Sequence, residues 1–237
     1  MLSPPRPFDA AKFPPASDAR LSLQRELAGD LRPVVIASMS RSGSTMLYRK
    51  VVSRWLDIRF GPDGPELLPC FADAAWRLDQ TPLIGGVVYK THDLPENLPR
   101  SARAKVVFTY RKASDVALSI ADKYANFGDP WFHSHRHHLG GAGGYEDFLR
   151  ADTLGLERQI DRWSAAEGLD VLGLRFETLW DHQRELDEFL GFAVKLRQRR
   201  ASPRPPAPPA LVERLGETYG ALDRKIAAMP DVFRRCA

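Results

Sequence analysis

The residues with the clearest chemical potential lie in a short polar loop. The apolar run Val34–Ala37 ends in SMSRSGST, residues 38–45, and a helical pattern follows. Small residues, a glycine and the positive end of a helix dipole can cradle an anion such as phosphate. A Walker loop carries lysine directly after its second glycine, where this chain has Ser44, and Arg41 supplies a cation from inside the loop instead. The loop therefore predicts binding of a phosphate-like anion without ordinary nucleoside triphosphate chemistry; the alternative is a strand–turn–helix whose serines cap the helix.

A second apolar run, residues 84–92, ends in Lys90, Thr91 and His92. Ligands of open α/β sheets bind at the carboxyl ends of parallel strands. Lys90 could neutralise charge that develops in a reaction, and His92 could accept a proton near neutral pH. Without the loop, these residues would be interpreted as an ordinary surface lysine and histidine.

A third apolar run, residues 104–111, ends in Arg111, and Ser119 follows two helical turns later. An arginine can hold a phosphate through two parallel hydrogen bonds, so Arg111 and Ser119 form a candidate site for a second phosphate. The alternative is an exposed ion pair of Arg111 with Asp115 and an ordinary helix serine.

The elements that must position these residues alternate between short apolar runs and helical patterns. This alternation predicts an α/β fold, a three-layer α/β/α arrangement with a central parallel sheet. A fourth strand is expected at 169–176. Helices are expected over 17–31, 44–56, 113–126 and 145–167. Another is expected to end at residue 190 and to begin at a capping box formed by Thr178 and Asp181. A terminal helix is indicated by an apolar stripe of Leu211, Leu215, Leu222 and Ile226.

The length of 237 residues suits one domain. We expect a single domain over 1–237, with an N-terminal extension and helix (1–32), a core (33–190) and a proline-rich linker with a C-terminal helix (191–237).

Composition excludes several classes of protein. Only two cysteines occur, and neither an apolar leader nor a run of 18 apolar residues is present, so we expect a cytoplasmic protein with no membrane span. The net charge of +4 favours an anionic partner, but no long basic run points to nucleic acid.

Residues 127–144 are rich in glycine and histidine and predict a long mobile loop. The spacing of His133, His135, His137 and His138 does not suit a closed tetrahedral metal site, so no metal is expected. The loop could instead line an acceptor entrance, with Trp131 and Phe132 contacting the acceptor.

Three segments, SMSRSGSTMLYRKV, VVYKTHDLPENLP and KVVFTYRKASDVALS, resemble the signatures of sulfotransferases that use 3′-phosphoadenosine 5′-phosphosulfate (PAPS), in the same order and strand context. WSAAEGLDVLGLRFETLW resembles a later strand and turn of that family. The resemblance covers residues 33–190 and mixes features of the bacterial or carbohydrate branches with those of the cytosolic small-molecule branch.

The resemblance implies a P-loop-like fold and a role for each candidate residue. His92 would be the general base on a hydroxyl or amine of a small-molecule or carbohydrate acceptor. Lys90 and Arg41 would stabilise charge on the leaving oxygen, adenosine 3′,5′-bisphosphate would be the product, and no metal would be required. Arg111 and Ser119 would hold the 3′-phosphate, and the 5′-phosphosulfate would be held by Arg41, Ser42, Gly43, Ser44 and Thr45.

The sequence also departs from the family pattern. Phe176 replaces a common tyrosine, and Arg199 and Arg200 stand near the place of a basic 3′-phosphate segment that is not recognisable here. The acceptor and the oligomeric state stay open. The alternatives are a P-loop kinase or related nucleotide-binding protein with a degenerate Walker loop, and a binding protein without turnover, which Lys90 and His92 argue against.

Overall fold

The computed structural model describes residues 22, 24–26, 30–197 and 207–237. Arg199, Arg200, most of the helix expected over 17–31 and most of the proline-rich linker lie outside these residues. The sheet has six strands in the order β2-β3-β1-β4-β5-β6. Its strands are β1 (Val34–Ser38), β2 (Ala72–Ala74), β3 (Val88–Thr91), β4 (Lys105–Tyr110), β5 (Asp170–Arg175) and β6 (Val232–Arg235).

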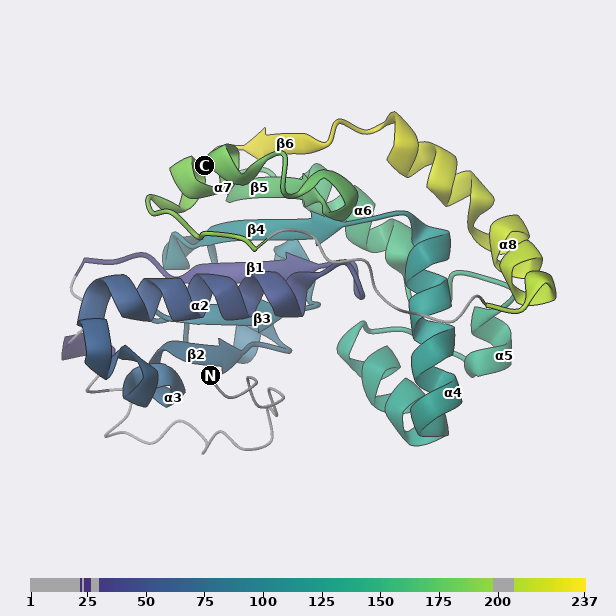
Figure 1. Ribbon diagram of the computed structural model, residues 1–237, viewed down its shortest axis with the longest axis horizontal. Helices are drawn as coiled ribbons and strands as arrows, with labels where there is room; N and C mark the ends of the chain where they lie inside the picture. The colour runs from purple at the N-terminus through teal and green to yellow at the C-terminus, as the bar shows by residue number, and fades with distance from the viewer. Residues whose placement is uncertain (1–21, 23, 27–29, 198–206) are drawn as a thin grey trace.

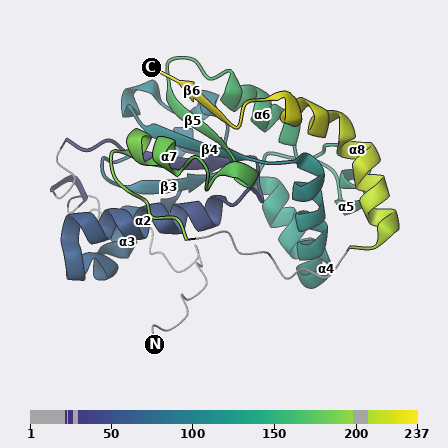
Figure 2. The same ribbon diagram turned by 45° about the horizontal axis from the view of Figure 1, so that its top comes forward.

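The prediction of an α/β fold with a central parallel sheet is confirmed, with one strand of opposite direction. β1 pairs in parallel with both β3 and β4, and only β6, at the edge, runs antiparallel to its neighbour. β1, β3 and β4 are wholly or largely buried, as expected for short apolar strands covered on both faces. In Figure 2, α2 and α6 lie on opposite sides of the sheet.

The helical elements occupy most of the remaining described chain. The α-helices are α2 (Ser44–Phe60), α3 (Leu68–Phe71), α4 (Ala113–His138), α5 (Tyr145–Phe148), α6 (Leu156–Ser164), α7 (Gln183–Leu190) and α8 (Pro209–Ala228). Short 3₁₀ turns are η2 (Gly61–Leu67), η3 (Leu78–Gln80), η4 (Pro95–Asn97), η5 (Arg100–Ala102) and η6 (Phe176–Thr178).

The prediction of a mobile loop over 127–144 is wrong for most of that range, because α4 continues to His138. The helix bends at Gly128, whose φ of 65° and ψ of −164° belong to a region that glycine alone adopts readily. Pro130 is tolerated in the first turn after the bend, where a backbone N–H has no helical partner. Phe132 is fully buried against Tyr124 and Phe148, so tertiary packing holds the second half of α4 in place.

Two other helix predictions are corrected. The single helix expected over 145–167 is divided into α5 and α6, because Asp152 accepts hydrogen bonds from the N–H groups of Leu156 and Glu157 and so starts a new helix. The capping box at Thr178 and Asp181 is not formed, and α7 begins at Gln183 without a side-chain cap.

The C-terminal part of the chain also contributes to the sheet. α8 buries Leu215, Leu222 and Ile226 of the predicted stripe, and Figure 1 shows it leading into β6 beside β5. The sheet thus includes a strand from beyond residues 33–190.

Candidate active site

The polar loop between β1 and α2 has a backbone shape that is rare outside functional sites. Ser40 and Arg41 have positive φ values of 79° and 44°, although neither is glycine. Gly43 has φ 80°, and a β-carbon there would lie 2.2 Å from Cε2 of Phe176. Glycine is therefore required at position 43 both by the left-handed backbone and by the ring that covers it.

The N-terminus of α2 has the properties of an anion site. No side chain caps it, and its first turn contains no acidic residue. The first N–H groups of a helix have no carbonyl within the helix to bind, so those of Ser44 and Thr45 are suited to an anion. The hydroxyl of Ser42 instead donates to Thr109 O at 2.8 Å, which fixes the loop against β4. The Ser42 hydroxyl therefore supports the loop.

Two cations accompany the loop. Nε of Arg41 donates to Oγ of Ser119 at 2.9 Å, so the structure brings Ser119 to Arg41. Lys90 stands opposite Ile36 in the pairing of β3 with β1, and its Nζ lies 5.3 Å from the centre of the Trp76 ring. Burial, with the nearby charge of Arg41, lowers the pKa of Lys90 to about 8, so it still carries its charge at neutral pH.

His92 is buried one residue beyond β3, beside the start of the loop. Its Nδ1 lies 3.0 Å from Oγ of Ser38 and 3.1 Å from O of Ser38. The Ser38 hydroxyl donates to Oγ of Ser44, and a carbonyl can only accept, so we assign the ring proton to Nδ1. Nε2 then carries the lone pair that a general base needs.

The environment of His92 keeps it neutral. Burial, followed by the charge of Lys90, holds its pKa well below the ordinary range. The Trp76 ring stacks on the His92 ring with centroids 5.8 Å apart. Neutral imidazole is the form that can accept a proton, and a bound anion would raise its pKa by offsetting the charge of Lys90.

Arg111 is placed differently from the other candidates. One guanidinium nitrogen lies 2.7 Å from a carboxylate oxygen of Asp115, and Nε lies 3.5 Å from a carboxylate oxygen of Glu177. The guanidinium also lies over the ring of Phe176, 5.2 Å from its centre. The ion pair with Asp115 is the alternative that the sequence left open, and Arg111 does not contact Ser119 in the described structure.

His135 and His138 belong to the site, although the sequence placed them in a mobile loop. Nε2 of His135 lies 2.7 Å from Oγ of Ser40, and its ring meets that of His92 edge-on at 5.8 Å. His138 stacks on Trp76 with centroids 4.0 Å apart. A helical spacing continued through Pro130 would have put both histidines on one face, three residues apart.

Phe132 is fully buried, so it cannot contact an acceptor as the sequence suggested. Among residues 30–197 and 207–237, no three His, Cys, Asp or Glu side chains are grouped to hold a metal ion. No helix in that part of the chain is long and apolar enough to cross a bilayer.

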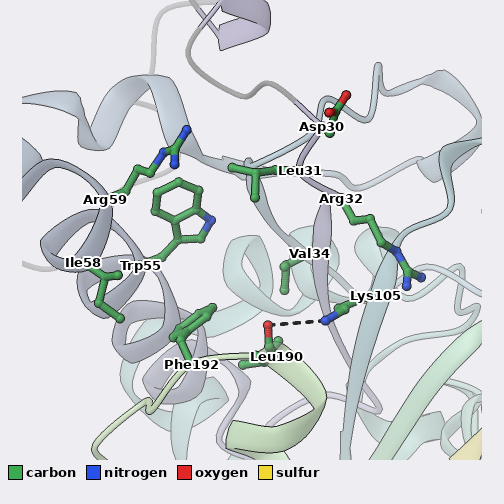
Figure 3. Close-up of a pocket in the computed structure, with 11 residues that line it drawn as sticks. Asp30, Leu31, Arg32, Val34, Trp55, Ile58, Arg59, Lys105, Leu190 and Phe192 are labelled. Carbon is green, nitrogen blue, oxygen red and sulfur yellow. Dashed lines mark hydrogen bonds between the residues drawn. The ribbon is translucent and has the colours of Figure 1, made fainter.

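One cavity of about 450 Å³ lies at the opposite end of the sheet, at the start of β1 and β4 (Figure 3). Its wall is largely apolar, with Trp55, Ile58 and Phe192. Lys105, a half-buried cation in its wall, donates to the backbone oxygens of Phe189 and Leu190 at the end of α7. This cavity is therefore separate from the anion loop.

Comparison with known proteins adds little to this description. No protein-family model matches the chain, and no curated protein matches it. Among solved structures, the chain is similar to mouse sulfotransferase SULT7A1 complexed with PAP, with 15% sequence identity, coverage of 90% of this chain and 74% of that chain, and a TM-score of 0.42. At this TM-score the similarity carries no argument about the chemistry of this chain.

Proposed function

We propose that this chain transfers a sulfuryl group from PAPS to a hydroxyl or amine, with His92 as general base. The observation that carries the proposal is the position of Lys90 and His92 beside the loop that follows β1. Register places Thr91 opposite Ala37, and His92 is hydrogen-bonded to Ser38. A base, a buried cation and an uncapped helix N-terminus thus meet at the carboxyl end of the sheet.

The residues present fit the 5′ end of PAPS better than they fit a nucleoside triphosphate with magnesium. The donors are backbone N–H groups, Arg41 and Lys90, all suited to anions. Asp93 is the carboxylate nearest in sequence to His92, and its oxygens already accept from Leu78 N and Leu94 N. A site built from cations and N–H groups suits sulfuryl transfer, in which no metal need bridge the leaving group.

In this mechanism PAPS supplies an activated sulfuryl group. His92 accepts the acceptor proton at Nε2, while its Nδ1–H stays anchored on Ser38 and fixes the ring. Lys90 and Arg41 place positive charge beside the oxygen on which negative charge develops as the old S–O bond breaks. The loop backbone and Thr45 hold the anion in line with the acceptor, and this positioning adds to the rate.

Adenosine 3′,5′-bisphosphate, without magnesium, is expected to raise the melting temperature far more than AMP does. A ligand at 100 times its dissociation constant adds about 2.7 kcal/mol to the free energy of unfolding. Thermal unfolding with each nucleotide checks this result. Equal shifts from AMP and the bisphosphate would remove the 3′-phosphate site, and a stronger effect of ATP with magnesium would favour the kinase alternative.

Arg111→Ala is expected to weaken bisphosphate binding by roughly 10-fold or more and to leave AMP binding nearly unchanged, because a hydrogen bond to a charged group contributes about 1.5–3 kcal/mol. The effect on the rate at saturation should be smaller, because the 3′-phosphate is remote from the reacting sulfur. Titration calorimetry measures both affinities.

Asp115→Asn is the matched control, because it removes the carboxylate that now pairs with Arg111. If Arg111 binds phosphate, this variant should bind the bisphosphate at least as tightly as the parent. If both variants change only the melting temperature, Arg111 is a structural residue and the 3′-phosphate site lies elsewhere.

A further inference from the structure

The second half of α4 brings a histidine into contact with the anion loop. After the bend at Gly128 the helix turns back on itself (Figure 1). Tyr124 and Phe132, eight residues apart, pack edge to face at 6.1 Å. His135 then reaches Ser40, one of the two loop residues with positive φ that are not glycine. The contact thus joins a packed helix to a strained part of the loop.

The His135 ring is held on two sides. Its Nε2 is 2.7 Å from Oγ of Ser40, and Trp131, one turn earlier on the same helix, stacks on its face at 4.8 Å. Its edge meets the ring of His92. His135 is therefore fixed beside both the anion loop and the proposed base, within reach of the group that would be transferred.

Among the described residues, the charged or titratable groups that act on His135 are cations or other histidines. They are Arg41 from the loop, Lys90 and His92 from the end of β3, and His138 from the same helix. Burial, then Arg41, then Lys90 and His138, lower the pKa of His135 to about 3. Arg41 and Lys90 are the same cations that a bound anion would neutralise. An anion in the loop would therefore offset the charges that lower the pKa of His135, and the pKa would rise.

We propose that His135 is an anion-binding residue of this site, which exchanges its hydrogen bond with Ser40 for one to an oxygen of the bound phosphosulfate. In doing so it takes up one proton from solvent and donates from Nε2–H. The inference rests on the proposed function for the identity of the anion. It adds a ligand contact from the second half of α4, so the segment beyond Gly128 takes part in holding the transferred group.

The first test follows the protonation of the His135 ring itself. Nitrogen-15 spectra of histidine rings, with the His135 signal assigned by its loss in His135→Asn, are recorded from about pH 5 to about pH 8. With sodium chloride alone the ring should stay neutral throughout. With adenosine 3′,5′-bisphosphate, or with inorganic sulfate, whose charge is constant over this range, it should become protonated toward the acidic end. A ring that titrates identically with and without these anions overturns the proposal.

The second test is affinity. His135→Asn should weaken bisphosphate binding by about 10-fold near pH 6, because a charge-assisted hydrogen bond is lost, and by less near pH 8. His133→Asn is the matched control, since His133 is exposed on the same segment and bonds only to the Asp129 carbonyl oxygen in its own turn. Wild-type affinity and proton uptake in a folded His135→Asn variant would also overturn the proposal.

These results separate the inference from the proposed function. Proton uptake that depends on His135, together with equal affinity for AMP and the bisphosphate, would support the anion contact and contradict PAPS as co-substrate. Tight bisphosphate binding that does not change in His135→Asn would support PAPS as co-substrate and contradict the anion contact of His135. Absence of binding by both the bisphosphate and sulfate would contradict both.

Discussion

Replacing His92 with alanine is expected to slow sulfuryl transfer by about 10²-fold or more, a barrier increase of roughly 2.7 kcal/mol. A hydroxyl is a poor nucleophile until a base accepts its proton, and Nε2 of His92 is the atom assigned to that step. Affinity for adenosine 3′,5′-bisphosphate should change little, because the proposed nucleotide contacts are backbone N–H groups, Arg41 and Lys90. The measurement needs an acceptor, found by screening phenols, alcohols, amines and sugars with radiolabelled PAPS.

His92→Asn distinguishes loss of the base from loss of structure. The asparagine amide can still donate to the Ser38 carbonyl in place of Nδ1, but it has no basic nitrogen in the position of Nε2. We expect the same loss of rate as for alanine, with a melting temperature closer to that of the parent. A near-parental rate in His92→Asn on a verified hydroxyl acceptor would place the base elsewhere, with His135 as the next residue to test.

Gly43→Ala is expected to lower the free energy of unfolding by about 2–4 kcal/mol, or roughly 5–15 °C in melting temperature, and to abolish measurable anion binding. A left-handed conformation costs an alanine about 1–2 kcal/mol, and the clash with Phe176 adds the strain of overpacking. Moving Phe176 aside would distort the loop that presents its N–H groups. Differential scanning calorimetry and bisphosphate titration give the two results.

Gly191→Ala provides the matched control for this substitution. Gly191 has φ 86° and ψ 13°, close to the 80° and 1° of Gly43, and the nearest atom to an added β-carbon is 4.0 Å away. It should show the backbone strain alone, with unchanged binding. Equal destabilisation by the two substitutions would mean that Phe176 yields freely and that the covering ring does not restrict the loop.

The sequence predicted the position of a residue correctly where that position depends only on which strand the residue follows. Short apolar runs located β1, β3, β4 and β5, and parallel pairing then brought their carboxyl ends to one edge. His92 and Lys90 reach the loop for that reason. β2 and β6 were missed because Ala72–Ala74 has no recognisable pattern and β6 buries only Phe233.

Long-range side-chain choices could not be predicted in this way. Arg111 precedes α4, whereas Ser119 lies inside it, and the sequence cannot say that Arg41 bonds Ser119 instead. Gly128 and Pro130 are local signals for a break, while the burial of Phe132 is a tertiary effect that continues the helix beyond them. Because the helix was predicted to end before this segment, His135 was not predicted to lie in the site.

The bend at Gly128 also separates a segment that can unfold at a smaller free-energy cost than the whole domain. Residues 129 to 138 contact the rest of the protein through buried Phe132, through His135 and His138, and through Arg136, which donates to the Gly143 carbonyl. Burying a phenylalanine contributes about 1.5–3 kcal/mol, whereas unfolding a whole domain typically costs about 5–15 kcal/mol. We therefore expect residues 129 to 138 to open at a lower free-energy cost than the six-stranded sheet, so that their amide hydrogens exchange before those of β1 and β4.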